Sequence, residues 1–345
     1  MQNRLMTALV MGACMNVLGG VAQASTDQGC AAAPKPVVSL DHGSRYIADD
    51  SSRSIVDPTS NADVNAQLKP IDAFIRSLVQ EANSVLAQKG DPAQSANCVV
   101  AQLAHWARAD ALSDLKNLTA NFSVGSRLAG FAFAYAQVRP YANSTQEKRL
   151  IEAWLLQRAR EQMAFWEEDA TPGSKRGNLR AWATLAINLA GYLTKDDSAL
   201  RWSAWSATFL QCQALEDGSL PQEMKRGKYA LHYQLHAIAP LVVTTLLLER
   251  QGLSIRGVCD DALIRIVRFA MSDLETGEKS QAYSGKPQSY FDGSESLEKY
   301  QLAWLEAYLL LHEDAGLTKI ANGLRPLSHS KLGGRQDLLW QAELK

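Results

Sequence analysis

Nine stretches with helical periodicity follow one another between residues 71 and 313, and they constrain the fold of this 345-residue chain more than any other feature. In each stretch apolar residues recur at steps of three and four, which is the period of an α-helix. The stretches cover 71–88, 98–115, 126–141, 147–168, 178–194, 199–215, 228–252, 262–274 and 296–313. Breaks such as TPGSKRG and LEDGSLP separate them, and no run alternates as a β-strand would. The pattern predicts an all-α protein whose antiparallel helical hairpins close into an incomplete α/α toroid, although a helical solenoid would have a similar pattern.

The first 24 residues have the features of a secretory signal peptide. Arg4 precedes an apolar run, and Ala22-Gln23-Ala24 before Ser25 matches an A-x-A cleavage site, with cleavage after Ala24. The run is interrupted by Asn16 and is too short to span a bilayer. A buried first helix is the alternative. The signal predicts a periplasmic or secreted protein, and no other stretch is typical of a transmembrane helix.

Residues 25–62 are rich in Ser, Asp and Pro and have no helical period, so we expect a loop, and long loops in compact domains are often functional. No shift in composition marks a second domain. The sequence therefore predicts a signal peptide over 1–24, an N-terminal segment over 25–62 and one helical domain over 63–345.

Four cysteines remain once Cys14 leaves with the signal peptide. An even number in an oxidising compartment permits disulfides, with three connectivities for Cys30, Cys98, Cys212 and Cys259. Their spacing does not fit a zinc site, which needs clustered pairs. Because Cys98 opens a predicted helix, a bridge from Cys30 would fasten the N-terminal segment to the helical domain.

The charge and motif content exclude several kinds of partner. The formal net charge of -1 gives no global attraction to nucleic acid or to an anionic membrane, so neither is expected as a partner. No metal-ligand cluster and no glycine loop for phosphate is present in the sequence, so no metal or cofactor is implied. We expect a monomer.

The run KRGKYALHYQLHAIAPL, residues 225–241, combines basic residues, tyrosines and histidines. On a helix Arg226, Tyr229, Tyr233 and His236 would share one stripe, while His232 would diverge from it. One interpretation is an ordinary helix edge with tyrosine hydroxyls at its rim. The other is catalytic, because a tyrosinate beside a cation can remove a carbon-bound proton and arginine can hold a carboxylate. Together these groups suit elimination next to a carboxylate.

The segment DGSLPQEMKRGKYALHY resembles DGxLPxExxRxxRALxYH of the alginate lyase family. CVVAQLAHWARADAL resembles the Cys-led helix of that family, KRGNLRAWA its NNHxxWA segment, LRPLSHSKLGG its RLGG stretch, and SRYIADDSSRS its lid loop. These matches follow one another in the family's order over most of the chain. The resemblance implies an α/α toroid and a polysaccharide lyase that cleaves mannuronate-rich alginate by β-elimination.

Carried over residue by residue, the resemblance assigns Tyr233 as base and acid, and Arg226 and Asn178 as the groups that neutralise the C5 carboxylate. The family's adjacent histidine is replaced by Leu179, which can neither donate to a carboxylate nor take a proton. His236, one turn after Tyr233, is the best replacement.

The leucine leaves three interpretations open. Another group has taken over, with His232 or Arg180 as weaker candidates. The enzyme acts instead on a related polymer such as glucuronan, since D-mannuronate and D-glucuronate differ only at C2. Otherwise the site is inactive and the protein binds polyuronate.

A second set of residues is expected to bind substrate, each with solvated surface or helix packing as the alternative: Arg45, Tyr46, Arg180, Trp182, Tyr229 and His232. A hydrolase that uses two carboxylates is the competing enzyme class, and Asp217 and Glu223 would be its pair. LEDGSLPQE is more typical of a turn before a helix.

Overall fold

Thirteen α-helices make up most of residues 29–342, the part of the chain that the computed structural model describes, and they confirm the predicted all-α fold. The chain forms two units, residues 1–30 and 31–345, and the following concerns the second. The predicted signal peptide and its cleavage site lie outside the described residues. The predicted Cys30–Cys98 bridge would join the two units, and it stays a prediction.

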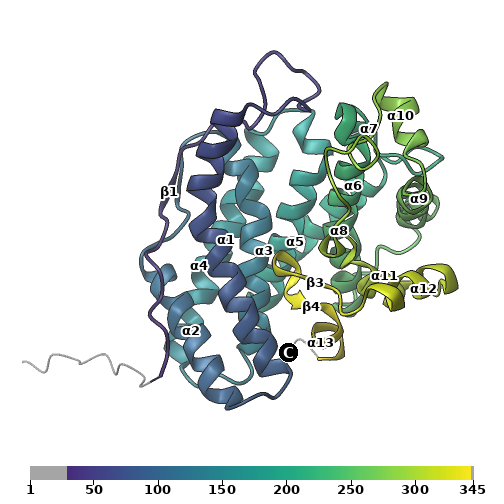
Figure 1. Cartoon of the computed structure of the whole chain (residues 1–345). Coiled ribbons are helices and arrows are strands. Elements are labelled where there is room, and N and C mark those ends of the chain that lie inside the picture. Colours follow the sequence, from purple (N-terminus) through teal and green to yellow (C-terminus); the bar gives the residue numbers. More distant parts are fainter. Residues whose placement is uncertain (1–28, 343–345) are drawn as a thin grey trace, which may run out of the picture. The chain divides into compact units, whose positions relative to one another are not determined.

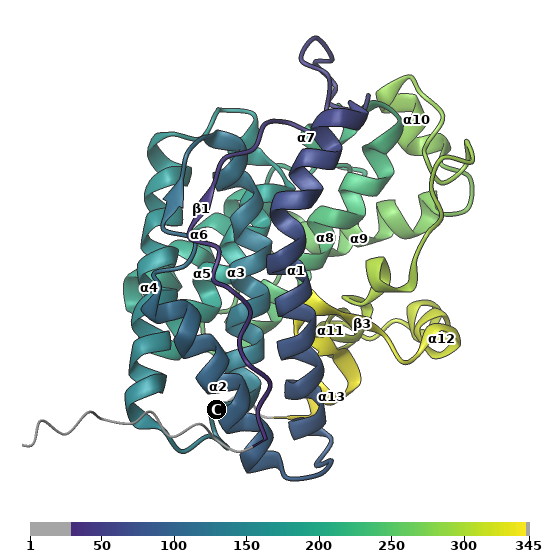
Figure 2. The ribbon, with the colours of Figure 1, turned by 60° about the vertical axis from the view of Figure 1, so that its left-hand side comes forward.

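Eight long helices form two rows, as Figures 1 and 2 show. In the inner row α3 packs against α1 and α5, and α5 packs against α8. In the outer row α2 packs against α4, α4 against α6, and α6 against α9. The inner helices are α1 (Pro58–Leu86), α3 (Leu118–Val138), α5 (Asn178–Thr194) and α8 (Ala230–Arg250), and the outer ones are α2 (Pro92–Arg108), α4 (Thr145–Glu168), α6 (Asp197–Gln211) and α9 (Val258–Asp273).

Composition explains which helices form the inner row. Helices α3, α5 and α8 are buried on nearly every face, as expected for helices that are apolar all round. One helical stretch among the described residues, Gly227–Arg250, is long and apolar enough to cross a bilayer, and 83% of its most apolar window is buried inside the protein. Its hydrophobicity is therefore accounted for by the position of α8 in the core.

Shorter elements close the C-terminal side of the rows. They are α7 (Pro221–Met224), α10 (Glu278–Ser284), the 3-10 helix η3 (Lys299–Leu302), α11 (Leu305–Leu311), α12 (Ala315–Leu324) and α13 (Gln336–Gln341). Strand β1 (Ser39–Leu40) pairs in parallel with β2 (Asp114–Leu115), and β3 (Ser328–His329) pairs antiparallel with β4 (Gly334–Arg335). The β3–β4 hairpin contacts the inner row, because β4 packs against α1.

Most helix boundaries differ from the sequence prediction, and the largest differences at helix starts are in α1, α2 and α3, the last of which begins at Leu118 rather than Ser126. Helix α1 begins at Pro58 rather than Ile71, and α2 at Pro92 rather than Cys98. Each starts with an aspartate N-cap followed by a proline, a common helix start. The polar first turns hid both starts, and Pro70 suggested a break. The stretch 296–313, predicted as one helix, is divided into η3 and α11.

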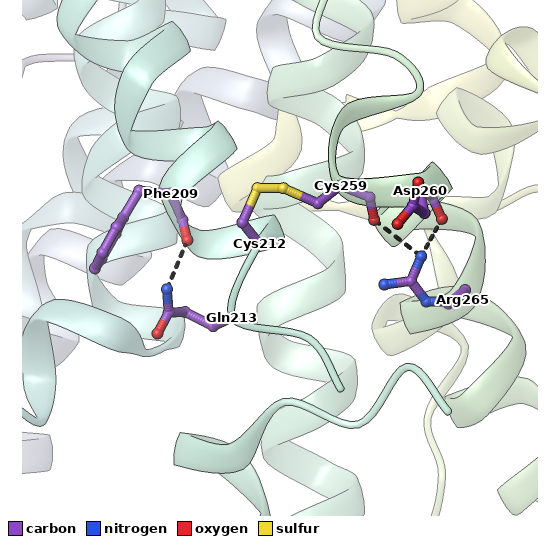
Figure 3. The surroundings of a disulfide bond; sticks show 6 residues. All are labelled: Phe209, Cys212, Gln213, Cys259, Asp260 and Arg265. Atoms are coloured by element: carbon purple, nitrogen blue, oxygen red, sulfur yellow. Dashed lines mark hydrogen bonds between the residues drawn. A yellow bond between two sulfur atoms is a disulfide. The ribbon is translucent and has the colours of Figure 1, made fainter. Parts of the chain in front are cut away.

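A disulfide joins Cys212, at the C-terminal end of α6, to Cys259 in the first turn of α9 (Figure 3). The side chain of Arg265 donates to the carbonyl oxygen of Cys259 at 2.9 Å, and also to that of Asp260. The expectation of structural disulfides is confirmed for this pair, which links two outer helices across 47 residues of sequence.

Candidate active site

A cavity of about 500 Å³ lies beside α5 and α8 and contains most of the residues predicted from the sequence. The predicted residues that line it are Arg45, Tyr46, Trp182, Tyr229, His232, Tyr233 and His236. They come from the N-terminal loop, α5, the 3-10 helix η2 (Gly227–Tyr229) and α8.

The guanidinium of Arg226 lies over the face of the Tyr233 ring, with Cζ 3.7 Å from the ring centroid. The sequence predicted this neighbourhood from one continuous helix, and that reason is wrong. Helix α8 begins only at Ala230, and Gly227 has a φ of +52°. Arg226 instead reaches Tyr233 from the connection between α7 and η2, as a cation over an aromatic face.

The N-terminal loop covers this pair. The hydroxyl of Tyr46 is hydrogen-bonded to that of Tyr233. Arg226 donates from Nε to the carbonyl of Ser52 at 3.1 Å and from Nη2 to that of Arg53 at 3.0 Å. The lid-like loop predicted from the sequence therefore contacts the two residues assigned to catalysis.

Gly227 makes this close approach sterically feasible. A Cβ at this position would lie 2.7 Å from the Ser54 hydroxyl oxygen, and its positive φ disfavours other residues. The loop tip has its own internal support, because the carboxylate of Asp50 accepts from the backbone N–H groups of Ser52, Ser54 and Ile55.

Tyr233 is a neutral phenol in this environment. Burial raises the pKa of its hydroxyl far above the usual range, and the hydrogen bond with Tyr46 and the charge of an ionised Tyr46 act in the same direction. Arg226 opposes this shift, because its charge favours the phenolate.

His236 is held in one tautomer. The indole Nε1–H of Trp182 donates to His236 Nδ1 at 2.5 Å, so Nδ1 carries a lone pair. Burial lowers the pKa of His236 well below the usual value, and the ring is neutral. The single ring proton of His236 is therefore on Nε2. Because His236 lines the cavity, its Nε2–H is the donor that this ring can offer to a ligand.

His232 is closer to the site than its helical position predicted. Its ring centroid lies 5.0 Å from that of Tyr233, and its Nδ1 lies 3.0 Å from Oε2 of Glu295. Glu295 also accepts from the Ser289 hydroxyl at 2.7 Å, so His232 is anchored to the segment before η3.

Asn178 lies beside Glu223 and does not line the cavity. Its backbone N–H and its Nδ2 each donate to the carboxylate of Glu223 at 2.7 Å. Burial raises the pKa of Glu223, while Arg226 and Asn178 lower it. Glu223 thus holds Asn178 through two hydrogen bonds, and Leu179 packs against the core.

Arg180 does not join this group. Its guanidinium carbon lies 4.8 Å from the Trp205 ring centroid and 5.2 Å from that of Trp202, and its Nη2 pairs with Glu167 at 2.7 Å. The side chain is buried between α5 and α6, so its placement supports a packing role and not the predicted substrate-binding role.

Several residues that line the cavity were not identified from the sequence as part of the site: Glu295, Tyr300, Gln301, His329 and Lys331. His329 stacks on Trp182 with ring centroids 5.6 Å apart. Lys331 lies 3.6 Å from Asp72, and burial, followed by the charge of Arg127, lowers its pKa to about 8. The sequence feature that could have identified His329 and Lys331 was the RLGG-like stretch, in which Lys331 occupies the position of the family's arginine.

Within residues 29–342 no three His, Cys, Asp or Glu side chains gather as a metal site would require. The cavity is lined by basic, aromatic and hydrogen-bonding groups, which suit a sugar acid.

Comparison with known proteins gives a consistent result. A family model described as alginate lyase matches residues 120–280. A polysaccharide lyase of Stenotrophomonas maltophilia is 30% identical over 84% of this chain and 85% of its own length. An alginate lyase of Pseudomonas fluorescens is 29% identical over 88% of this chain and 82% of its own.

Solved structures show the same fold. Alginate lyase A1-III from Sphingomonas species A1 superposes with a TM-score of 0.72 at 23% identity, covering 90% of this chain and 85% of that one. A histidine-to-alanine variant of alginate lyase A1-III complexed with tetrasaccharide gives a TM-score of 0.77, with the same identity and coverage. The likeness confirms the predicted incomplete α/α toroid.

Proposed function

Because this chain belongs to the alginate lyase family and is a polysaccharide lyase, we propose that it cleaves a mannuronate-rich polyuronate by β-elimination with Tyr233 as base and acid. The observation that carries the proposal is the Arg226 guanidinium 3.7 Å from the Tyr233 ring centroid beside a cavity lined by basic and aromatic groups. This is the arrangement that a tyrosinate base needs.

The reaction requires a single proton carrier. The Tyr233 oxygen takes the proton from C5 of the uronate, and the electron pair of that C–H bond forms the C4=C5 double bond. The C4–O4 bond breaks, and the leaving O4 receives the proton from Tyr233. The products are an unsaturated uronate and a chain with a free hydroxyl, and the phenolate is regenerated.

Neutralising the C5 carboxylate makes the proton removable, and we assign this role to Arg226, Asn178 and His236. The fixed Nε2–H of His236 supports it as the replacement for the histidine that Leu179 displaces, because a neutral imidazole donor can still bind a carboxylate. The role of Asn178 rests on the family resemblance and on its two hydrogen bonds to Glu223, whose pKa the charge of Arg226 lowers against the effect of burial.

The phenol of Tyr233 must lose its proton before it can act as a base. Its hydrogen bond to the half-buried hydroxyl of Tyr46 provides a route for that proton toward solvent. Below the pKa of Tyr233 the phenolate fraction grows about tenfold per pH unit, so we expect kcat to rise with pH.

The test is the ultraviolet absorbance of the unsaturated uronate, measured with polymannuronate, polyguluronate and glucuronan. We expect the largest signal with polymannuronate, and its loss in Tyr233→Phe. Retained activity in Tyr233→Phe would refute the mechanism, and unchanged activity in His236→Ala would refute only the histidine replacement.

The same assay distinguishes the alternatives. A larger signal with glucuronan would assign the other polymer. Polymer binding without absorbance, unchanged in Tyr233→Phe, would identify a binding protein, which Leu179 makes the second candidate. We also propose export from the cell, which N-terminal sequencing of the mature protein tests, since the first residue should be Ser25.

A further inference from the structure

A second cavity of about 1010 Å³ adjoins the candidate active site. It lies between the C-terminal half of α1 and the segment that contains β3, β4 and α13. Three residues, Tyr300, His329 and Lys331, line both cavities and form the boundary between them. The two cavities are therefore neighbours, close enough for one polymer chain to contact both.

One face of α1 forms the length of this groove. The helix contributes residues at steps of three and four, namely Arg76, Val79, Gln80, Asn83, Ser84 and Ala87. At about 1.5 Å of rise per residue the stripe runs for about 16 Å, which suits an extended ligand such as a short oligosaccharide. Its polar side chains can hydrogen-bond to sugar hydroxyls.

The groove is basic. Four cationic side chains line it against one carboxylate, that of Asp72, and they are Arg76, Lys89, Lys331 and Arg335. Asp72 is already bound by Arg127 at 2.7 Å and by Lys331 at 3.6 Å, so it adds little free negative charge.

The four cations differ in what they already bind. Arg335 donates from Nε to Asp337 at 2.7 Å, and Lys331 pairs with Asp72, whereas Arg76 and Lys89 are exposed. Because an exposed cation loses little hydration when it meets a carboxylate, Arg76 and Lys89 are the most available partners for an anionic ligand.

We propose that this groove binds uronate residues of the polymer beyond those in the active site, and so forms distal subsites for a carboxylate-bearing polysaccharide. The proposal rests on the proposed function for its ligand class. Arg76 and Lys89 bind carboxylates, and Tyr300, which is 50% exposed, offers a ring face for a sugar at the boundary. Binding along the groove would make affinity depend on chain length, since a short oligomer fills the active site alone.

The experiment compares Arg76→Ala/Lys89→Ala with the control Arg201→Ala/Lys319→Ala. The control removes the same charge from exposed positions that line neither cavity. We measure KM and kcat for long-chain polymannuronate and for trimannuronate, with thermal unfolding as a check on folding.

The groove pair should raise KM for the polymer about five- to tenfold at low salt, as expected from two lost charge contacts. KM for trimannuronate and kcat for both substrates should stay within about twofold of wild type, and the control should match wild type. The difference should shrink toward 1 M salt, where the screening length falls to about 3 Å.

The groove proposal would be overturned if the groove pair raised KM equally for the polymer and the trimer, or if the groove pair and the control pair raised KM equally. Either result would leave the lyase activity of the wild type unaffected. If the wild type produced no unsaturated product, the proposed function would fail separately. Equilibrium binding of polymannuronate would then decide the matter: weaker binding in the groove pair alone supports the groove, and equal binding in both pairs refutes it.

Discussion

Lys331 should make substrate affinity depend on pH between about pH 7 and pH 9. It lines the candidate active site and the adjoining groove, and burial lowers its pKa from 10.5 to about 8. The charges that act on it are the carboxylate of Asp72 at 3.6 Å and the guanidinium groups of Arg127 and Arg45. A lysine binds a uronate carboxylate well only when it is protonated, so binding should weaken as pH rises through this pKa.

The magnitude follows from the titration. With a pKa of about 8, about nine-tenths of the Lys331 side chains are charged at pH 7 and about one-tenth at pH 9. If only the charged form binds well, KM for polymannuronate should rise about tenfold between these two pH values. Arginine at this position stays charged throughout, and it is the residue of the RLGG stretch that this segment resembles.

The assay measures KM from pH 6.5 to pH 9.5 for wild type, Lys331→Arg and Lys331→Met. The ratio of the wild-type KM to the KM of Lys331→Arg cancels the titration of every other group, including Tyr233. This ratio should rise about tenfold above pH 8. Lys331→Met should show the high-pH behaviour at every pH. A ratio that stays flat up to pH 9.5 would refute the reasoning.

Three further variants test the fold and the site. Replacing Cys212 and Cys259 by serine opens a 47-residue loop, which should remove about 4 kcal/mol of unfolding free energy and lower Tm by about 6 °C in calorimetry; an unchanged Tm contradicts this. Trp182→Phe removes a hydrogen bond worth about 0.5–1.5 kcal/mol and should lower kcat about two- to tenfold. Nitrogen-15 NMR should then find both tautomers of His236, and one surviving tautomer would contradict the role of the indole. Tyr46→Phe should lower kcat at neutral pH by removing the proton route, and an unaltered pH profile of kcat would exclude it.

Local periodicity located the helices of the core, although it missed the starts of α1 and α3. Helix α5 has the predicted bounds, 178–194, because Gly177 precedes it with extended backbone and Lys195 ends it in the left-handed region. Helix starts with polar first turns were missed, since a capped turn that buries little has no apolar period. Residue order also misled at Arg180, because residues two apart on a helix point about 200° apart, and Arg180 therefore faces α6 rather than the side of α5 on which Asn178 lies.

The local sequence pattern predicted only those residues of the site that lie close together along the chain. Tyr233, His232 and His236 are close in sequence and come from one helix, so a local pattern predicts them together. His329 and Lys331 approach the same cavity from about a hundred residues away, through the hairpin that packs on α1. A period within one segment cannot encode such a long-range contact, and only the resemblance of the RLGG-like stretch pointed toward it.

The hydrogen bonds from Arg226 to the loop carbonyls link the position of the N-terminal loop to the position of the positive charge over Tyr233. Two of its five N–H groups are used on Ser52 and Arg53, and three remain for a carboxylate. A displacement of this loop would remove the two acceptors that fix the direction of the guanidinium over Tyr233. The placement of the positive charge beside Tyr233 is therefore coupled to the position of the N-terminal loop.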